Sequence, residues 1–209
     1  MSTMKLCLII HPNNQNTILD RIAHEIGASF DNPIYHYGTE SIPRADHYFI
    51  THYSMLPSVL GQVNPGITPV TCFFTHDKGT AIDYTEALNL CHSVIAESPE
   101  GEELLRSFGG MDEILHFVPE GGDADRFKPH ERKDDGAVLI CGTNYEDGRK
   151  NPEIAIEVKK LTPNRHFMFI GKGWNGLEPE YKDYPSLFVG CSIYLSCSKL
   201  EGGGPNSLI

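Results

Sequence analysis

The sequence predicts an α/β fold made of two successive parallel sheets, and three observations lead to that prediction. Short apolar runs alternate with segments whose apolar residues recur at helical spacing, as in βαβ units. A stretch rich in proline, glycine and charge, from Pro119 to Gly136, then breaks this rhythm. The alternation restarts at Ala137, which suggests a second Rossmann-like domain. We therefore expect a first Rossmann-like domain over residues 1–130 and a partial second domain over residues 137–209.

Five strands and three helices are expected in the first domain. Residues Leu6 to Ile10 form a continuous apolar run, which fits a parallel strand buried on both faces. Ser98 followed by Pro99 predicts a helix start, because serine caps a helix and proline suits its first turn. The expected strands cover residues 6–10, 46–51, 70–74, 93–96 and 114–118, and the expected helices lie at about 18–26, 81–90 and 99–107.

The second domain is expected to be incomplete. Its predicted strands cover residues 138–141, 166–170 and 192–195, and its predicted helix begins at Pro152 after an N-cap at Asn151 and runs to Leu161. Three strands bury little core. A last helix starting at Pro205 has about five residues, too few to be stable alone. We expect the chain to be the front part of a longer protein or a naturally shortened form. A second copy of the chain is one partner that could cover the exposed edge.

Composition excludes several classes of function. The formal net charge is −11, so the chain lacks the basic field that non-specific nucleic-acid binding needs. No apolar run is long enough to cross a membrane, and no membrane span is expected. The six cysteines form no C-x-x-C pair, which indicates reduced thiols and a cytoplasmic location. No metal site is expected, because the histidines lack the spacing of metal ligands.

Two loops have the composition of anion-binding sites. The first, Gly142 to Asn151, follows a predicted strand and ends at a helix start, where unpaired N–H groups attract anions. Its Arg149 and Lys150 add two positive charges that suit a diphosphate. An ordinary basic pair on a solvated loop explains these two residues equally well. The second loop, Glu201 to Gly204, puts a carboxylate before three glycines, which suits sugar hydroxyls and a close backbone approach to a ligand.

A histidine follows the predicted strand at residues 70–74. His76 is expected at the carboxyl end of that strand, where an imidazole can hydrogen-bond a sugar hydroxyl or stabilise developing charge. The neighbouring Asp77 could hold His76 or cap the next helix. A surface or capping histidine is an equally good explanation, because the chain contains ten histidines.

Four segments of the sequence resemble the retaining GT-B glycosyltransferases of family 4, also called glycosyl transferases group 1. Residues 118–129, VPEGGDADRFKP, resemble the segment that joins the two domains of these enzymes. Residues 140–150 resemble the strand and basic loop that open the donor domain. Residues 167–173 and 187–209 resemble a glycine-containing strand end and the glutamate and glycine loop of the same domain. The resemblance implies a GT-B-like fold.

The resemblance also implies roles for the residues of the first loop. Lys150 matches the lysine that binds the donor diphosphate, and Gly142 matches the glycine that opens the loop. The family's arginine beside that glycine is replaced here by Thr143. Arg149 is therefore expected to take over its contact with the phosphates.

The resemblance gives further residues a role toward the donor sugar. Glu201 matches the glutamate that holds the sugar hydroxyls, and His76 stands where the family often carries a histidine facing the sugar. Gly203 and Gly204 match the backbone that meets the sugar and the phosphates. The family's second glutamate, which holds the ribose, would fall beyond Ile209.

The function implied by the resemblance is sugar transfer from a nucleotide-diphosphate sugar to a carbohydrate or another hydroxyl acceptor. The transfer would retain the anomeric configuration and need neither a metal ion nor a cofactor, since the nucleotide-sugar is a substrate. One alternative is a non-catalytic truncated remnant that binds a nucleotide-sugar or a protein partner. Another is a different GT-B reaction, such as epimerisation of a sugar nucleotide.

Overall fold

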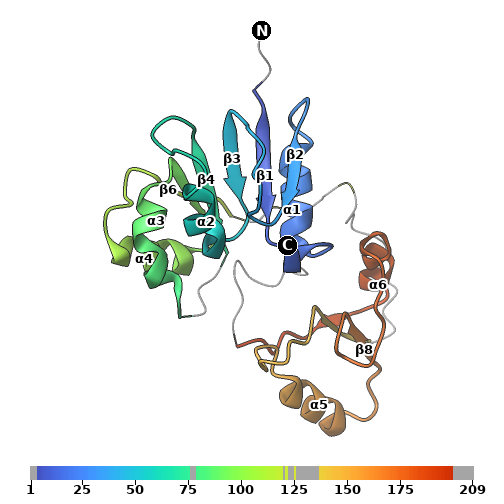
Figure 1. Ribbon diagram of the computed structural model, residues 1–209. Coiled ribbons are helices and arrows are strands. Elements are labelled where there is room, and N and C mark those ends of the chain that lie inside the picture. Colours follow the sequence, from blue (N-terminus) through green and yellow to red (C-terminus); the bar gives the residue numbers. More distant parts are fainter. Residues whose placement is uncertain (1–3, 76–78, 120, 122–124, 126–136, 200–209) are drawn as a thin grey trace. The chain divides into compact units, whose positions relative to one another are not determined.

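The chain forms two compact units, unit 1 over residues 1–119 and unit 2 over residues 120–209. The computed structural model describes residues 4–75, 79–119, 121, 125 and 137–199. Both units are built around a parallel sheet, so the predicted α/β, GT-B-like fold class is confirmed (Figure 1). The predicted boundary between residues 130 and 137 falls outside the described residues.

Unit 1 contains a six-stranded parallel sheet in the order β2-β1-β3-β4-β5-β6. Residues pair in register along it, for example Leu8 of β1 with Tyr35 of β2 and with Phe49 of β3. The strands are β1 (Leu6–Ile10), β2 (Ile34–Tyr37), β3 (His47–Ile50), β4 (Val70–Phe74), β5 (Ser93–Ala96) and β6 (Leu115–Phe117).

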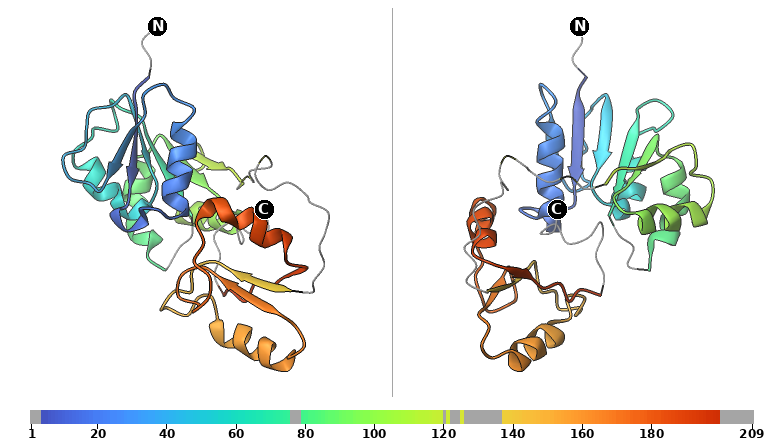
Figure 2. Two further views of the ribbon diagram at one scale, coloured as in Figure 1. Left: turned by 90° about the vertical axis from the view of Figure 1, so that its right-hand side faces the viewer. Right: turned by 180° about the vertical axis from the view of Figure 1, so that it is seen from behind.

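Helices cover both faces of this sheet (Figures 1 and 2). Successive strand residues point to opposite faces. Leu8 and Ile10 therefore pack against α1, while Ile9 and Phe74 face the core shared with α2, α3 and α4. The helices are α1 (Ile18–Gly27), α2 (Leu56–Leu60), α3 (Thr85–Asn89) and α4 (Pro99–Phe108), with short 3-10 turns η1 (Pro12–Asn14), η2 (Tyr53–Met55) and η3 (Ala81–Tyr84).

The structure corrects the expected elements of unit 1 in three places. Strand β2 was not predicted, because an edge strand has a neighbour on one side only and its residues need not be buried. Helix α2 was not predicted either, since its five residues are too few to show a helical period. The helix expected over residues 81–90 is a 3-10 turn at Ala81–Tyr84 followed by α3.

Unit 2 contains a three-stranded parallel sheet in the order β8-β7-β9. One cluster of its small core contains buried Val138, Ile140, Ala155 and Phe167, and Ala137, Leu139 and Ile170 are buried as well. The predicted helix is confirmed as α5, while α6 lies in a segment expected to be irregular. The elements are β7 (Val138–Cys141), α5 (Pro152–Leu161), β8 (Phe167–Ile170), η4 (Tyr181–Asp183), α6 (Tyr184–Val189) and β9 (Ile193–Tyr194).

In each sheet the strand order reverses at one point, because successive strands are added first on one side of the first strand and then on the other. In unit 1, β1 continues to β2 on one side and β3 is added on the other; in unit 2, β7 stands in the same way between β8 and β9. The loops after the two central strands diverge there and leave a crevice at the carboxyl ends, where α/β proteins bind ligands. His11 and His52 follow β1 and β3, and Gly142 follows β7.

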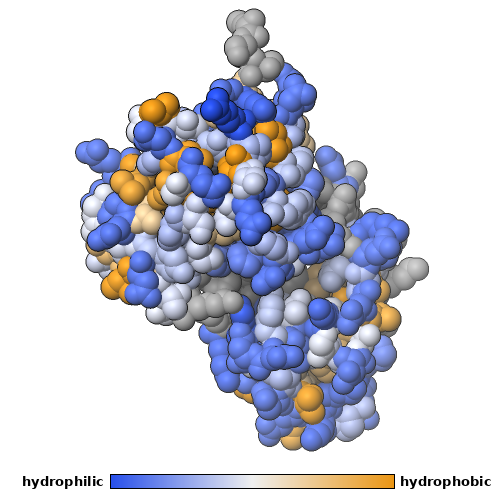
Figure 3. Space-filling view, viewed as in Figure 1, coloured by the Kyte–Doolittle hydropathy of each residue, from blue (hydrophilic) through white to orange (hydrophobic). Residues whose placement is uncertain are grey.

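On the face seen in Figure 3, exposed hydrophobic residues are interspersed with hydrophilic ones. The exposed apolar side chains include Ile67, Ile82 and Leu161. Isolated exposed apolar residues of this kind are normal. No helix among the described residues is long and apolar enough to cross a membrane.

Candidate functional site

Gly142 and Lys150, two residues of the predicted diphosphate site, come together in unit 2. Gly142 follows β7 with a φ of +116°, a conformation that favours glycine. A Cβ at this position would lie 3.7 Å from both Cε and Nζ of Lys150. The Lys150 ammonium group therefore rests against the backbone at the end of β7. Any side chain at position 142 would be strained by this φ, while its Cβ would lie at ordinary van der Waals distance from the Lys150 ammonium group.

The loop after β7 is held against the loop after β8. The Gly142 N–H donates to the Ile170 carbonyl at 3.0 Å, and the Asn144 N–H donates to the Lys172 carbonyl at 2.8 Å. The indole N–H of Trp174 donates to the Gly142 carbonyl at 2.7 Å. These bonds extend the β7–β8 pairing beyond the strands and fix the backbone that carries Gly142.

Two glycines make this close approach possible. A Cβ on Gly171 would overlap the Gly142 carbonyl, and one on Gly173 would come within 2.6 Å of the Asn144 carbonyl. Both glycines also have positive φ, +115° and +82°. The glycines at the strand end over residues 167–173 therefore have a structural role in this chain, because they allow the loops after β7 and β8 to pack closely.

Arg149 is held by its own loop. Its Nη2 and Nε lie 2.7 and 2.8 Å from Oδ2 of Asp147. The guanidinium also stacks over the ring of Tyr145, 4.1 Å from its centroid, and the side chain is only 14% exposed. The Asp147 carboxylate offsets the Arg149 charge, and the sequence analysis did not anticipate this pair. An acidic residue two positions before the arginine was the available signal.

The segment after β9 runs beside this loop. The Leu195 N–H donates to the Leu139 carbonyl and the Lys199 N–H donates to the Arg149 carbonyl, both at 2.8 Å. The segment that leads to the second predicted loop therefore contacts the first loop as far as Lys199. Glu201, Gly203 and Gly204 lie outside the described residues, so their placement stays a prediction.

Helix α5 begins directly after Lys150. Asn151 occupies the predicted N-cap position with a φ of +52°, but its side chain makes no capping hydrogen bond, and Pro152 opens the helix as expected.

Burial raises the pKa of the nearby Cys141 to about 11, although the Lys150 charge acts to lower it. The thiol therefore stays neutral at physiological pH. Among the described residues, no three His, Cys, Asp or Glu side chains gather as metal ligands.

Two histidines mark the corresponding edge of unit 1. The His11 and His52 rings lie 5.9 Å apart, after β1 and β3. Nδ1 of His11 accepts the N–H of Asn13, and Nδ1 of His52 accepts the N–H of Ser54, each at 3.2 Å. Because Nδ1 is the acceptor, a neutral ring carries its proton on Nε2. Each imidazole thus starts a 3-10 turn and fixes its own tautomer.

The ends of β4 and β5 carry further polar residues. His76 lies outside the described residues, and its role stays a prediction. Thr75, Glu97 and Ser98 are buried at this edge, and Ser98 accepts the Gly101 N–H as the predicted cap of α4. Glu97 was missed from the sequence. Its signal was an acidic residue directly after the apolar run of β5, where a buried carboxylate needs polar surroundings.

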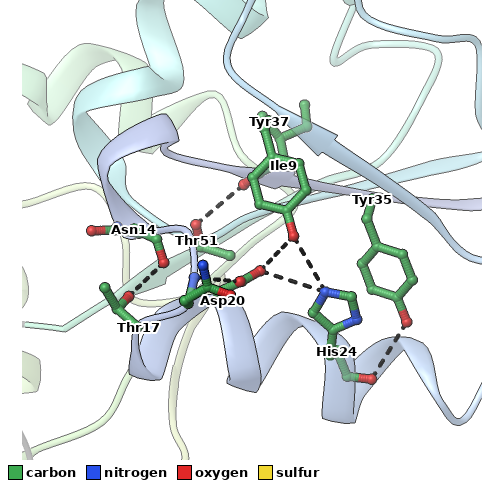
Figure 4. Close-up of polar contacts among 9 residues, drawn as sticks. Ile9, Asn14, Thr17, Asp20, His24, Tyr35, Tyr37 and Thr51 are labelled. Atoms are coloured by element: carbon green, nitrogen blue, oxygen red, sulfur yellow. Dashed lines mark hydrogen bonds and ion pairs between the residues drawn. The ribbon is translucent and has the colours of Figure 1, made fainter. Parts of the chain in front are cut away.

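A hydrogen-bonded cluster around Asp20 joins α1 to β2 (Figure 4). This carboxylate, 6% exposed, accepts the Asn16 N–H and the Tyr37 hydroxyl, both at 2.7 Å. Nε2 of His24 lies 3.3 Å from the Tyr37 hydroxyl, and the His24 ring stacks on Tyr35. Burial and the bond to Asp20 raise the pKa of Tyr37 to about 12, so this hydroxyl keeps its proton and donates it. The cluster was not predicted, because β2 was not.

Comparison with solved structures identifies similar folds. HepE from Anabaena, in complex with UDP and glucose, superposes with a TM-score of 0.67 at 12% identity, covering 94% of this chain and 75% of HepE. HepE in complex with UDP-glucose gives 0.66 at 14%, covering 94% and 74%. A TarM variant from S. aureus, in complex with Fondaparinux, alpha-GlcNAc-glycerol and UDP, gives 0.59 at 12%, covering 78% and 38%. Protein-family models and curated protein sequences give no match. At identities this low, it is the TM-scores that establish a shared fold.

Proposed function

We propose that this chain is a retaining, metal-independent glycosyltransferase that moves a sugar from a nucleotide-diphosphate sugar to a hydroxyl acceptor. The observation that carries the proposal is the position of the Lys150 ammonium group, 3.7 Å from where a Cβ on Gly142 would lie, close in sequence to the start of α5. A cation, an open backbone position and a helix N-terminus together suit a diphosphate. The similar folds of HepE and TarM, whose structures contain UDP, support the same ligand class.

The proposed roles divide the donor between two loops. Lys150 binds the diphosphate, with Gly142 giving it room, and Arg149 contributes less because Asp147 already offsets its charge. Glu201 holds the hydroxyls of the donor sugar and the backbone of Gly203 and Gly204 meets the phosphates; His76 faces the sugar. These last roles rest on the sequence resemblance.

The chemistry follows from charge. Cleavage of the glycosidic bond to the diphosphate leaves negative charge on the phosphate oxygens and positive charge on the sugar, as in an oxocarbenium ion. Lys150 and the positive N-terminal end of α5 stabilise the leaving group, which is the part a metal ion otherwise plays. Glu201 and His76 hold the sugar while the acceptor hydroxyl attacks the anomeric carbon and passes its proton to a phosphate oxygen of the departing diphosphate. The six cysteines are free thiols, which supports a cytoplasmic enzyme.

One observation favours a second candidate, a binding protein without catalysis. The ion pair between Arg149 and Asp147 lowers the net positive charge of the loop. A loop with less positive charge stabilises a departing diphosphate less, although it can still bind a nucleotide-sugar.

The two candidates separate in one experiment on the full chain. UDP-glucose is titrated by calorimetry, and release of UDP and glucose is followed by mass spectrometry. We expect binding with slow release, and Lys150→Ala should weaken binding roughly tenfold to hundredfold, the value of a charge-assisted hydrogen bond. Lys160→Ala removes the same charge from an exposed position of α5 and should change neither readout. Binding without release supports the binding protein, and no binding at all contradicts both.

A further inference from the structure

A groove of about 440 Å³ lies at the carboxyl edge of the unit 1 sheet. Its walls come from the segments that follow β1, β2 and β3, so it occupies the point where the direction of the sheet changes. The polar side chains along it belong to His11, Tyr37, Thr39, Glu40, Ser54 and Ser58.

The polar groups of the groove complement a ligand rich in hydroxyls. His11 accepts the Asn13 N–H at Nδ1, so its neutral ring presents Nε2–H as a donor. Glu40 is exposed and offers a carboxylate that only accepts. The Ser54 hydroxyl lies 2.8 Å from Nδ1 of His52 and donates to it when that nitrogen is the acceptor, so it can accept from a ligand, while the Ser58 hydroxyl can donate or accept. A sugar hydroxyl also donates one hydrogen bond and accepts others, so donors and acceptors side by side are what a carbohydrate needs.

Tyr37 adds a fixed aromatic ring to this wall. Its hydroxyl donates to Asp20 at 2.7 Å and lies 3.3 Å from Nε2 of His24, as Figure 4 shows. Asp20 is itself held by the Asn16 N–H. The ring is therefore tied at its tip while 39% of the residue stays exposed. A ring held in this way can pack against the apolar C–H face of a pyranose at little cost in side-chain entropy.

The charge of unit 1 selects against anionic ligands. Residues 1–119 contain 5 Lys and Arg against 14 Asp and Glu, a net charge of −9, whereas residues 120–209 contain 12 against 14. Glu40 adds a negative charge in the groove itself. Like charges repel a phosphorylated or carboxylated sugar from such a surface.

We propose that this groove binds a neutral carbohydrate, with Tyr37 as the ring against which the sugar packs and Glu40 as the acceptor of its hydroxyl hydrogen bonds. Its role as the acceptor site rests on the proposed glycosyltransferase function. Binding itself does not depend on that function, because every group that carries the argument belongs to unit 1.

The test is an NMR titration of the 15N-labelled full chain. The probes are the methyl glycosides of glucose, mannose, galactose and N-acetylglucosamine, with glucose 6-phosphate and glucuronate as anionic counterparts. At least one neutral glycoside should shift the amides of residues 11–15, 37–40 and 54–58, and the anionic sugars should bind more weakly. Glu40→Gln should weaken binding roughly tenfold, the effect of losing one charge-assisted hydrogen bond. Glu86→Gln, an exposed change of equal charge on α3, should have no effect.

Variants of Tyr37 test whether its ring contributes to carbohydrate binding. Tyr37→Ala should abolish detectable binding, while Tyr37→Phe keeps the ring and should retain it; both are checked for an intact amide spectrum. The proposal is overturned if no neutral glycoside shifts those amides, if the anionic sugars bind as well, or if Glu40→Gln behaves like Glu86→Gln. UDP is titrated separately against the amides of residues 142–150. Failure of UDP to bind counts against the proposed function and leaves the groove assignment standing.

Discussion

The two units share a sheet geometry but carry different charged residues at their candidate sites. In each, we expect the ligand in the crevice between diverging loops at the carboxyl ends of the central strands. Unit 1 lines its groove with Glu40 and His11, within a net charge of −9 over residues 1–119. Unit 2 puts Lys150 and Arg149 there. Topology thus sets where a ligand binds, and the residues of the loops set its chemistry.

The units also differ in how much core supports the site. In unit 1, helices pack on both faces of six strands, and many apolar side chains are fully buried, including Leu8, Ile50 and Phe74. Among the described residues of unit 2, seven apolar residues are buried around three strands. We therefore expect unit 2 to be the less stable of the two. Trp174 is the single tryptophan of the chain and lies in unit 2, so its fluorescence reports on that unit.

The largest effect on the free energy of unfolding is expected when the same substitution, phenylalanine to alanine, is made in the core of each unit. Phe74→Ala empties a fully buried position in unit 1 and should lower the free energy of unfolding by about 3–5 kcal/mol. Phe167→Ala should cost less, because Phe167 is 8% exposed and fewer buried residues surround it. Urea unfolding followed by far-UV circular dichroism and by Trp174 fluorescence measures both. A shift of the Trp174 transition by Phe74→Ala would show that the units do not unfold separately.

A smaller effect is expected where the loops of unit 2 touch. Gly171→Ala combines an unfavourable φ with an overlap of the Gly142 carbonyl, and it should cost at least about 2 kcal/mol. Gly148→Ala is the matched control: its φ is +70°, but no atom lies within 4 Å of the new Cβ. Backbone strain alone should then cost about 1 kcal/mol. Equal shifts of the Trp174 midpoint in the two variants would contradict the close loop contact.

The smallest expected effect concerns pH and unit 1. Burial lowers the pKa of His47, and the charge of His92 lowers it further, while Nε2 of His47 lies 2.8 Å from the Thr71 hydroxyl. The unfolded chain therefore binds a proton near the ordinary pKa of about 6.5 before the folded chain does, and unit 1 should lose stability as the pH falls below that value.

His47→Gln should make this loss shallower, and His166→Gln, an exposed position in unit 2, should leave it unchanged. Urea midpoints from circular dichroism at pH 7.5 and 5.5 measure the difference. An identical pH dependence in wild type and His47→Gln would rule out this source of acid sensitivity.

The sequence predicted the elements that carry a strong local signal. Continuous apolar runs such as Leu6 to Ile10 and capping pairs such as Ser98 and Pro99 are local signals, and the structure confirms the elements they predicted. Strand β2 and helix α6 lack such signals: one is an edge strand, and the other has six residues, none of them buried. Both depend on tertiary contacts that the local pattern does not contain.

The candidate sites show the same difference between residues that a local sequence signal predicts and residues that only tertiary contacts bring together. Gly142 and Lys150 were predicted together from a loop composition and a resemblance; the structure places the Lys150 ammonium group near position 142, and their role toward a diphosphate stays a prediction. The bond from Tyr37 to Asp20 could not be predicted, since it needs β2 to bring residues 17 positions apart onto neighbouring elements. His76 and Glu201 remain predictions, because both lie outside the described residues.

Hydrogen–deuterium exchange with and without UDP tests the central claim most directly, that the loop after β7 is the nucleotide site. The predicted result is protection of a peptide covering residues 138–152, no change in a peptide covering α4, and loss of the protection in Lys150→Ala. Protection confined to unit 1, or protection of residues 138–152 that survives Lys150→Ala, would contradict it.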